Sequence, residues 1–204
     1  MTNKFFYLFF KRIFDIIFSL IILIALLIPF FLISVMIKAT SKGPIFYNWN
    51  VVGKDGVFFN SFKFRTMVIN ADELKERLQE KNEMSGPFFK MKNDPRITRV
   101  GRYLRKYSLD ELPQFISVLQ GKMSVVGPRP PLQSEYKNFS NFQKKKLAVK
   151  PGITCLWQVD GRNNINDADE WIKKDLEYIS KRGFIFDISI IFKTIITVFR
   201  GTGK

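Results

Sequence analysis

Residues 13–37 read IFDIIFSLIILIALLIPFFLISVMI. Only Asp15, Ser19, Pro29 and Ser34 interrupt the apolar character of this run. At about 25 residues it is long enough to cross a bilayer as a helix. It is too long for a secretory signal peptide, and no small-residue cleavage site follows it. The run therefore predicts a membrane segment, with a buried core helix as the alternative.

The path of this segment through a membrane is left open by the residues themselves. Pro29 lies past its middle and removes a backbone hydrogen bond, so we expect a kink there. Cations stand on both flanks, with Lys4, Lys11 and Arg12 before the run and Lys38 and Lys42 after it. Positive flanks prefer the cytoplasmic side, and a re-entrant hairpin places both flanks on that side. A plain kinked span is the equal alternative.

The composition excludes several kinds of chemistry. The chain has 204 residues, with 33 Lys and Arg against 18 Asp and Glu, a formal net charge of +15. This excess favours an anionic partner such as phospholipid or nucleotide, and no nucleic-acid recognition motif is present. Because there is no His and only one Cys, a His base, an internal disulfide and a Cys-cluster zinc site are excluded. The remaining candidates are carboxylates, Lys, Arg, Tyr, hydroxyls and a hard metal such as Mg²⁺.

The remainder of the chain predicts an α+β fold that is mainly helical, with a small β-hairpin. The hairpin is expected between residues 43 and 67, because the turn signals of residues 53–56 separate two strand-like runs. On its second strand Lys63 and Arg65 share one face. Two cations so placed can hold phosphate, or they can simply be solvated.

Helices are expected over residues 70–83, from Thr98 onward, and over the apolar tail of residues 184–199. The second of these carries a basic stripe, formed by Arg99, Arg102 and Lys106, with Arg105 beside it. The stripe suits phospholipid headgroups or solvent. The tail suits a membrane interface or a place in the core.

The densest polar motif is SLDELPQ, residues 108–114. Ser108 and Glu111 fit a capping box, and Pro113 suits the first position of a new helix, so helix capping is one interpretation. The other is chemical. A helix N-terminus keeps carboxylates ionised, an ionised Asp110 can attack phosphorus, and Glu111 can help to hold Mg²⁺.

Two loops further along the chain present single arginines. Three prolines within residues 128–131 stiffen the backbone around Arg129, whose planar fork matches phosphate oxygens. The turn at Asp160 and Gly161 presents Arg162. A structural proline turn and a solvated cation are the respective alternatives.

These motifs, in this order, resemble the bacterial sugar transferase family, and more narrowly its monotopic phosphoglycosyl transferases. The matching stretches are residues 11–15, 61–67, 94–98, 109–114, 126–131 and 150–163, so the resemblance covers nearly the whole chain. One departure is Ile28 before Pro29, where some relatives have Ser.

The resemblance implies an aspartate that attacks the β-phosphate of a UDP-sugar, releases UMP and passes the phosphosugar to polyprenyl (undecaprenyl) phosphate. It implies Asp110 as the nucleophile, Glu111 beside it near a required Mg²⁺, and Lys63, Arg65, Arg129 and Arg162 as phosphate or nucleotide contacts. It also implies a membrane helix that re-enters at Pro29.

The same resemblance predicts the organisation of the chain. Residues 1–42 are expected to form a re-entrant membrane helix, and residues 43–204 a catalytic domain on the cytoplasmic face of the bacterial inner membrane, against anionic lipid. Larger relatives carry further spanning helices and another domain before this module, so the chain resembles the minimal catalytic unit.

Overall fold

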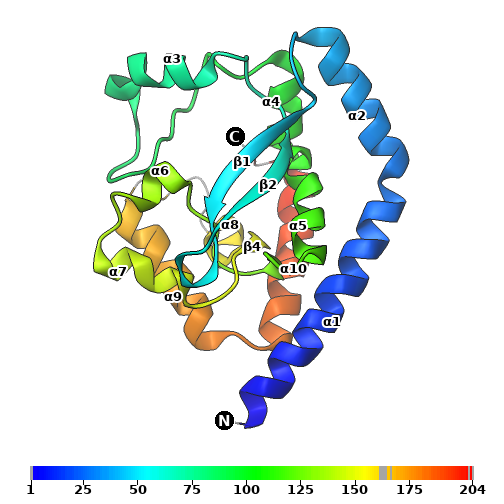
Figure 1. The fold of residues 1–204 in the computed structure, drawn as a ribbon, viewed down its shortest axis with the longest axis vertical. Helices are drawn as coiled ribbons and strands as arrows, with labels where there is room; N and C mark the ends of the chain where they lie inside the picture. The colour runs from blue at the N-terminus through cyan, green and yellow to red at the C-terminus, as the bar shows by residue number, and fades with distance from the viewer. Residues whose placement is uncertain (1, 161–164, 166, 202, 204) are drawn as a thin grey trace.

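The computed structural model describes residues 2–160, 165, 167–201 and 203. Figure 1 shows a long bent pair of helices, α1 and α2, running along one side of a body of helices and short strands. The helices are α1 Thr2–Ala25, α2 Leu27–Thr40, α3 Ala71–Arg77, α4 Arg99–Lys106, α5 Phe115–Leu119, α6 Gln133–Tyr136, α7 Asn141–Lys144, α8 Leu156–Val159, α9 Ala168–Lys181 and α10 Phe184–Arg200. The strands are β1 Phe46–Val52, β2 Phe58–Phe64, β3 Ser124–Val126 and β4 Gly152–Thr154.

The predicted fold class is confirmed. Helices dominate the described residues, and β1 and β2 form the expected antiparallel hairpin, with Phe46 opposite Phe64 and Val52 opposite Phe58. The hairpin turn closes through Asp55, which adopts a left-handed φ of 57°. This conformation is one that Asp tolerates better than most residues.

The apolar run folds as two helices that meet at Leu26. By length and composition, none of the described helices crosses a membrane alone, whereas Lys4–Ala25 and Leu27–Thr40 together qualify as a pair bent by 60°. The bend precedes Pro29 by three residues, and this offset has a steric cause. A proline ring clashes with the carbonyl four residues earlier, which here belongs to Ala25, the last residue of α1.

The helix α1 is fastened to the body by polar contacts as well as apolar ones. Arg12 donates hydrogen bonds to the carbonyls of Val118 (2.6 Å) and Leu119 (2.8 Å) at the end of α5. Asp15 is buried and accepts a hydrogen bond of 3.0 Å from the backbone N–H of Val125 in β3. The polar residues at the start of the apolar run therefore bind the body.

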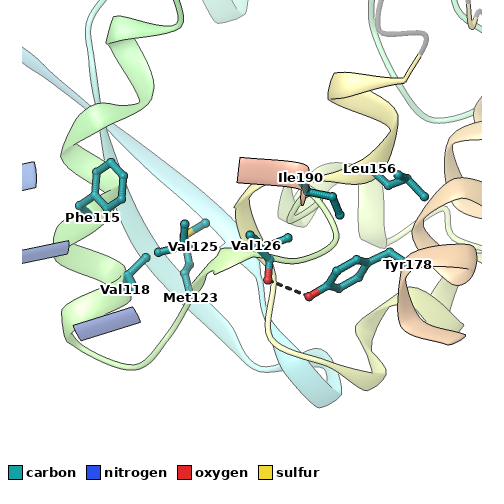
Figure 2. Packing of buried hydrophobic residues seen from close by; sticks show 8 residues of the cluster. All are labelled: Phe115, Val118, Met123, Val125, Val126, Leu156, Tyr178 and Ile190. Atoms are coloured by element: carbon teal, nitrogen blue, oxygen red, sulfur yellow. Dashed lines mark hydrogen bonds between the residues drawn. The ribbon is translucent and has the colours of Figure 1, made fainter. Parts of the chain in front are cut away.

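The main core lies where α5, α8, α9 and α10 surround the short parallel pair β3 and β4 (Figure 2). Its buried members are Phe115, Val118, Met123, Val125, Val126, Leu156, Tyr178 and Ile190. The hydroxyl of Tyr178 satisfies its hydrogen bond by donating to the Val126 carbonyl at 3.1 Å. This core holds β3 rigidly, and the loop that follows β3 carries Arg129.

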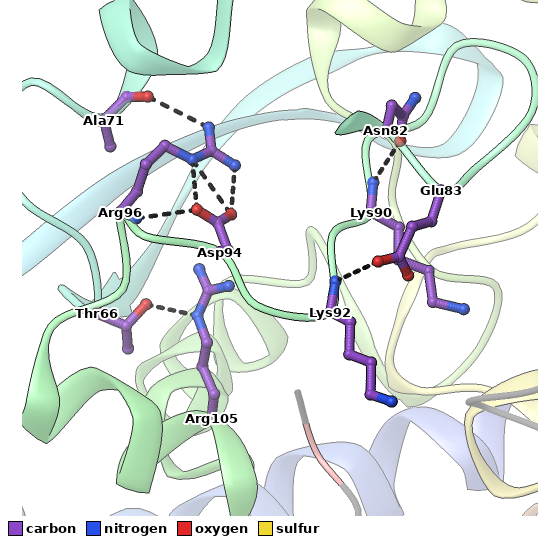
Figure 3. Close-up of polar contacts among 9 residues, drawn as sticks. All are labelled: Thr66, Ala71, Asn82, Glu83, Lys90, Lys92, Asp94, Arg96 and Arg105. Carbon is purple, nitrogen blue, oxygen red and sulfur yellow. Dashed lines mark hydrogen bonds and ion pairs between the residues drawn. The ribbon is translucent and has the colours of Figure 1, made fainter. Parts of the chain in front are cut away.

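Two of the expected helices differ in extent. The cap at Thr98 is confirmed, because its side chain accepts from the Gly101 N–H and α4 follows. The helix expected over residues 70–83 is shorter: α3 ends at Arg77, and a 3₁₀ turn, Gln79–Lys81, follows it. The Asn82 side chain explains the early end, since it binds the backbone of Met84 and Lys90 and so closes a loop in place of another helical turn (Figure 3).

The tail forms α10 as expected. One face of this helix packs in the core, and the opposite face is exposed and apolar. Asp187 and Ile190 are buried against the body. Ile185, Phe192 and Phe199 are exposed on its other side. An apolar face left exposed in this way suits a membrane interface.

Candidate active site

The SLDELPQ motif forms a 3₁₀ helix, Leu109–Gln114, that leads directly into α5. Ser108 precedes it with a left-handed φ of 54°, and its side chain makes no capping hydrogen bond. The capping-box interpretation is therefore wrong. The tight turn directs Asp110 into the body, where it is only 8% exposed, and Glu111 lies beside it.

Two of the predicted cations converge on Glu111 from different elements. Lys63, on β2, places its Nζ 2.7 Å from Glu111 Oε1. Arg129, on the loop after β3, places its NH1 atom 3.5 Å from the same oxygen. The structure therefore brings together four of the predicted site residues: Lys63, Asp110, Glu111 and Arg129.

An aromatic ring organises the two cations. Trp49 lies on β1 and is 5% exposed. Lys63 Nζ lies 3.6 Å from the centre of the indole ring, and the guanidinium carbon of Arg129 lies 5.6 Å from it. The negative face of an indole attracts cations, so Trp49 helps to hold both beside Glu111.

The cluster holds buried cations and carboxylates that shift one another's pKa values. Burial lowers the pKa of Lys63 from its ordinary value, and the negative charge of Glu111 is the main opposing influence. Burial also lowers the pKa of Arg105, on α4, and the negative charge of Asp110 opposes this shift most. The acids and cations thus stabilise one another's charged forms, and Asp110 is surrounded by positive charge from both Lys63 and Arg105.

The loop that presents Arg129 is held on both sides. The Pro131 carbonyl accepts from the Val52 N–H of β1 at 3.0 Å, and the Pro128 carbonyl accepts from the Gly152 N–H of β4 at 2.9 Å. Behind it, the fully buried Asp175 of α9 interacts with the backbone amide of Arg129. Lys146 pairs with Asp175 at 2.5 Å. Arg129 therefore projects from a preorganised backbone.

Arg105 is placed by a second buried network (Figure 3). Its Nε donates to the Thr66 hydroxyl at 2.9 Å, at the end of the hairpin. Nearby, Arg96 clamps Asp94 with its NH2 atom 2.6 Å from Asp94 Oδ2. Burial alone raises the pKa of Asp94, but its hydrogen bonds with Arg96 outweigh burial and hold that pKa below the usual value.

The remaining predicted contacts lie elsewhere. Arg65 is 6% exposed and donates to the backbone carbonyls of Ser41 and Lys42, so its guanidinium closes the end of α2 and does not join the cluster. It lies one residue beyond β2, where the chain turns away from the face that carries Lys63. Arg162 lies outside the described residues.

The acidic pair fits a hard metal ion held together with substrate. In the described part of the chain, no group of three His, Cys, Asp or Glu side chains could enclose a metal ion. Mg²⁺ does not need such a cage, since it commonly binds one or two carboxylates plus substrate phosphates. Asp110 and Glu111 offer that donor set.

Comparison with known proteins gives the family. A family model described as bacterial sugar transferase matches residues 6–201. The chain belongs to the bacterial sugar transferase family. The matched residues include most of α1 and all of α2 as well as the body, so the helix pair belongs to the part of the chain that the family model describes.

Individual relatives of this sugar transferase are similarly named. It is 48% identical to the galactosyl transferase CpsE of Streptococcus agalactiae over 79% of this chain and 36% of that protein. The chain is 38% identical to the exopolysaccharide production protein ExoY of Rhizobium meliloti, over 86% of this chain and 79% of that protein. The chain is 38% identical to the UDP-glucose:undecaprenyl-phosphate glucose-1-phosphate transferase of Escherichia coli, over 83% of this chain and 35% of that protein. The chain thus spans little more than a third of two of these relatives.

Two residues of the candidate site, Trp49 and Arg105, could not be assigned to it from the sequence. Trp49 gave no signal beyond its place in a strand. Arg105 belongs to the same basic helix as the stripe, but it lies on another face, because successive helical residues are rotated by about 100°. Arg99, Arg102 and Lys106 are exposed, whereas Arg105 is turned inward.

Replacing Trp49 tests its role in the sugar transferase site. We expect Trp49→Leu to lower kcat/KM for UMP release about tenfold, because cation–π contacts are worth about 1–2 kcal/mol when desolvated. Trp49→Phe keeps an aromatic face, so its kcat/KM should lie between that of the unaltered protein and that of Trp49→Leu. Steady-state kinetics measure the effect, with thermal unfolding as the check on folding. Equal rates for the Leu and Phe variants would contradict the role assigned to the ring.

Proposed function

We propose that this protein transfers a sugar-1-phosphate from a UDP-sugar to undecaprenyl phosphate, releasing UMP and starting the assembly of a polysaccharide on the membrane. The observation that carries the proposal is the buried Asp110, set beside Glu111 and among the cations Lys63, Arg105 and Arg129. The names of relatives support the same substrates.

The residues suit a two-step displacement. In the first step a carboxylate oxygen of Asp110 attacks the β-phosphorus of the UDP-sugar, and the bond from that phosphorus to UMP breaks, so UMP leaves with its electron pair. In the second step a phosphate oxygen of undecaprenyl phosphate attacks the same phosphorus and displaces the Asp110 carboxylate. Neither step requires a histidine base, in keeping with a chain that has none.

The cations lower the barrier through charge. Lys63 and Arg129 contact Glu111. Arg105 lies close enough to Asp110 for the charge of that carboxylate to raise the pKa of Arg105. Positive groups fixed in advance stabilise the charge that develops on phosphate oxygens, without reorganisation during the reaction. We propose that Asp110 and Glu111 hold Mg²⁺, which neutralises diphosphate charge when it is bound.

We further propose that the bent pair α1 and α2 is a re-entrant anchor, with the body on the cytoplasmic face of the inner membrane. The 60° bend and the cations on both flanks support this path over a straight span. The arrangement keeps the site at the surface where a lipid-linked phosphate and a water-soluble nucleotide meet.

Cysteine labelling tests the path of the anchor. In a Cys155→Ser background, we expect Lys4→Cys and Lys42→Cys to react with a membrane-impermeant maleimide from the same, cytoplasmic face. Cys155 is 1% exposed and so is shielded from the reagent in the folded protein, and its replacement removes labelling from any unfolded chains. The comparison uses right-side-out and inverted vesicles. Labelling of the two positions from opposite faces would establish a span.

The activity itself is tested with the full chain in detergent or nanodiscs. A panel of UDP-sugars is offered with undecaprenyl phosphate and Mg²⁺, and UMP and the lipid product are measured. We expect equal amounts of both with at least one sugar, and a burst of UMP near one equivalent when the lipid is omitted. A protein that binds membranes but releases no UMP from any UDP-sugar would be a lipid-binding module instead.

A further inference from the structure

A groove outside the active site opens between the first half of α1 and the connection from α9 to α10. Figure 1 shows these segments side by side at the end of the molecule that carries the N-terminus. They touch where Phe14 meets Phe184 edge to face, with ring centres 6.0 Å apart. The groove has a volume of about 870 Å³.

The lining of the groove is largely apolar and includes two cations. Its walls come chiefly from Phe6, Phe10, Ile13, Ile17 and Ile179. Lys4 and Arg182 also line it, and none of its lining residues carries a carboxylate. Asp187, which accepts a hydrogen bond from the lining residue Tyr7, is 4% exposed and already paired with Lys11 at 2.5 Å. The groove therefore presents uncompensated positive charge beside an apolar channel.

The order of residues along α1 gives the groove a direction. Lys4 stands at the solvent end, and Ile17 lies thirteen residues further into the apolar run, about 20 Å away at 1.5 Å per residue. A lysine at the start of α1 followed by an apolar channel of this length matches a phosphate headgroup followed by one acyl chain. The apolar faces beside it, including Phe9 on α1 and Ile185 on α10, are exposed as well.

We propose that this groove binds an anionic membrane phospholipid, with its phosphate at Lys4 and Arg182 and one acyl chain along α1. The occupant is not the acceptor lipid, because none of the groove-lining residues belongs to the cluster around Asp110 and Glu111. Such a lipid fills the space between anchor and body, and so fixes the angle at which α1 meets α10. The inference rests on the proposed membrane location but not on the transfer reaction.

The test uses photo-crosslinking in nanodiscs. Phosphatidylglycerol with a diazirine in its acyl chain is compared with the matching phosphatidylcholine, on the full chain carrying Asp110→Asn, and crosslinked peptides are mapped. We expect phosphatidylglycerol to label residues 4–17 and 179–184 preferentially. Lys4→Glu with Arg182→Glu should reduce this labelling about tenfold or more, since each cation near an anionic headgroup contributes about fivefold to the affinity.

The matched control reverses two exposed lysines outside the groove, Lys137→Glu with Lys173→Glu, and should leave the labelling unchanged. Equal labelling by both lipids, labelling confined to other segments, or displacement of the probe by undecaprenyl phosphate ahead of phosphatidylglycerol would each overturn the proposal. Because the Asp110→Asn chain carries out no transfer, a failed crosslink is distinguishable from a failed transferase assignment. The latter is judged on UMP release by the unaltered chain.

Discussion

Asp110→Asn is expected to abolish the release of UMP from a UDP-sugar, with a loss of at least about 10⁴-fold, the order seen when a covalent nucleophile is removed. The amide has nearly the same shape as the carboxylate but cannot attack phosphorus or carry its charge. The variant should also fail to form the burst of UMP in the absence of undecaprenyl phosphate. Quenched-flow measurement of UMP, with mass spectrometry of the intact protein, records both.

Two features make this result interpretable. Asp55→Asn is the matched control, because Asp55 lies in the hairpin turn with its side chain 69% exposed. It should retain full activity. Thermal unfolding of Asp110→Asn checks that the variant is folded at the assay temperature, since the amide keeps the volume of the carboxylate but removes the charge that faces Lys63 and Arg105. An Asp110→Asn protein that still forms a phosphosugar adduct would remove Asp110 from the role of nucleophile.

Lys146→Met is expected to destabilise the protein by about 3–5 kcal/mol, since it leaves the fully buried Asp175 without its counter-charge. For a chain of this size that corresponds to a fall in Tm of roughly 10 °C. Burial raises the pKa of Asp175, and Lys146 is the first influence that opposes this shift. Without Lys146 the carboxylate must either stay charged in the core or take up a proton.

The neighbouring Lys145 provides the control, because it is exposed where Lys146 is buried. Lys145→Met should leave the Tm unchanged. The double variant Lys146→Met with Asp175→Leu removes both charges and should recover much of the lost stability. It should not recover the rate of UMP release fully, because Asp175 also interacts with the backbone amide of Arg129. Equal Tm values for Lys146→Met and Lys145→Met would show that the pair contributes little.

Much of this protein can be predicted from local pattern. The apolar run, the proline within it and the turn signals before β2 are each short-range features, and the structure has the bent helix pair and the hairpin where they are expected. The position of the bend illustrates the limit. Pro29 predicts a break, but the clash acts four residues back, so the helix ends at Ala25.

The sequence by itself determined the helical α+β class and the apolar run through residue type and spacing, and the ordered resemblance to one family singled out Asp110, Glu111, Lys63 and Arg129 as candidates. Only the tertiary structure decided which cations meet the acids. Lys63 and Arg65 share a predicted strand face, yet the chain leaves β2 between them, so Lys63 reaches Glu111 while Arg65 closes α2. Trp49, Arg105 and Asp175 join the site through packing between segments distant in the chain, and no local pattern encodes such contacts.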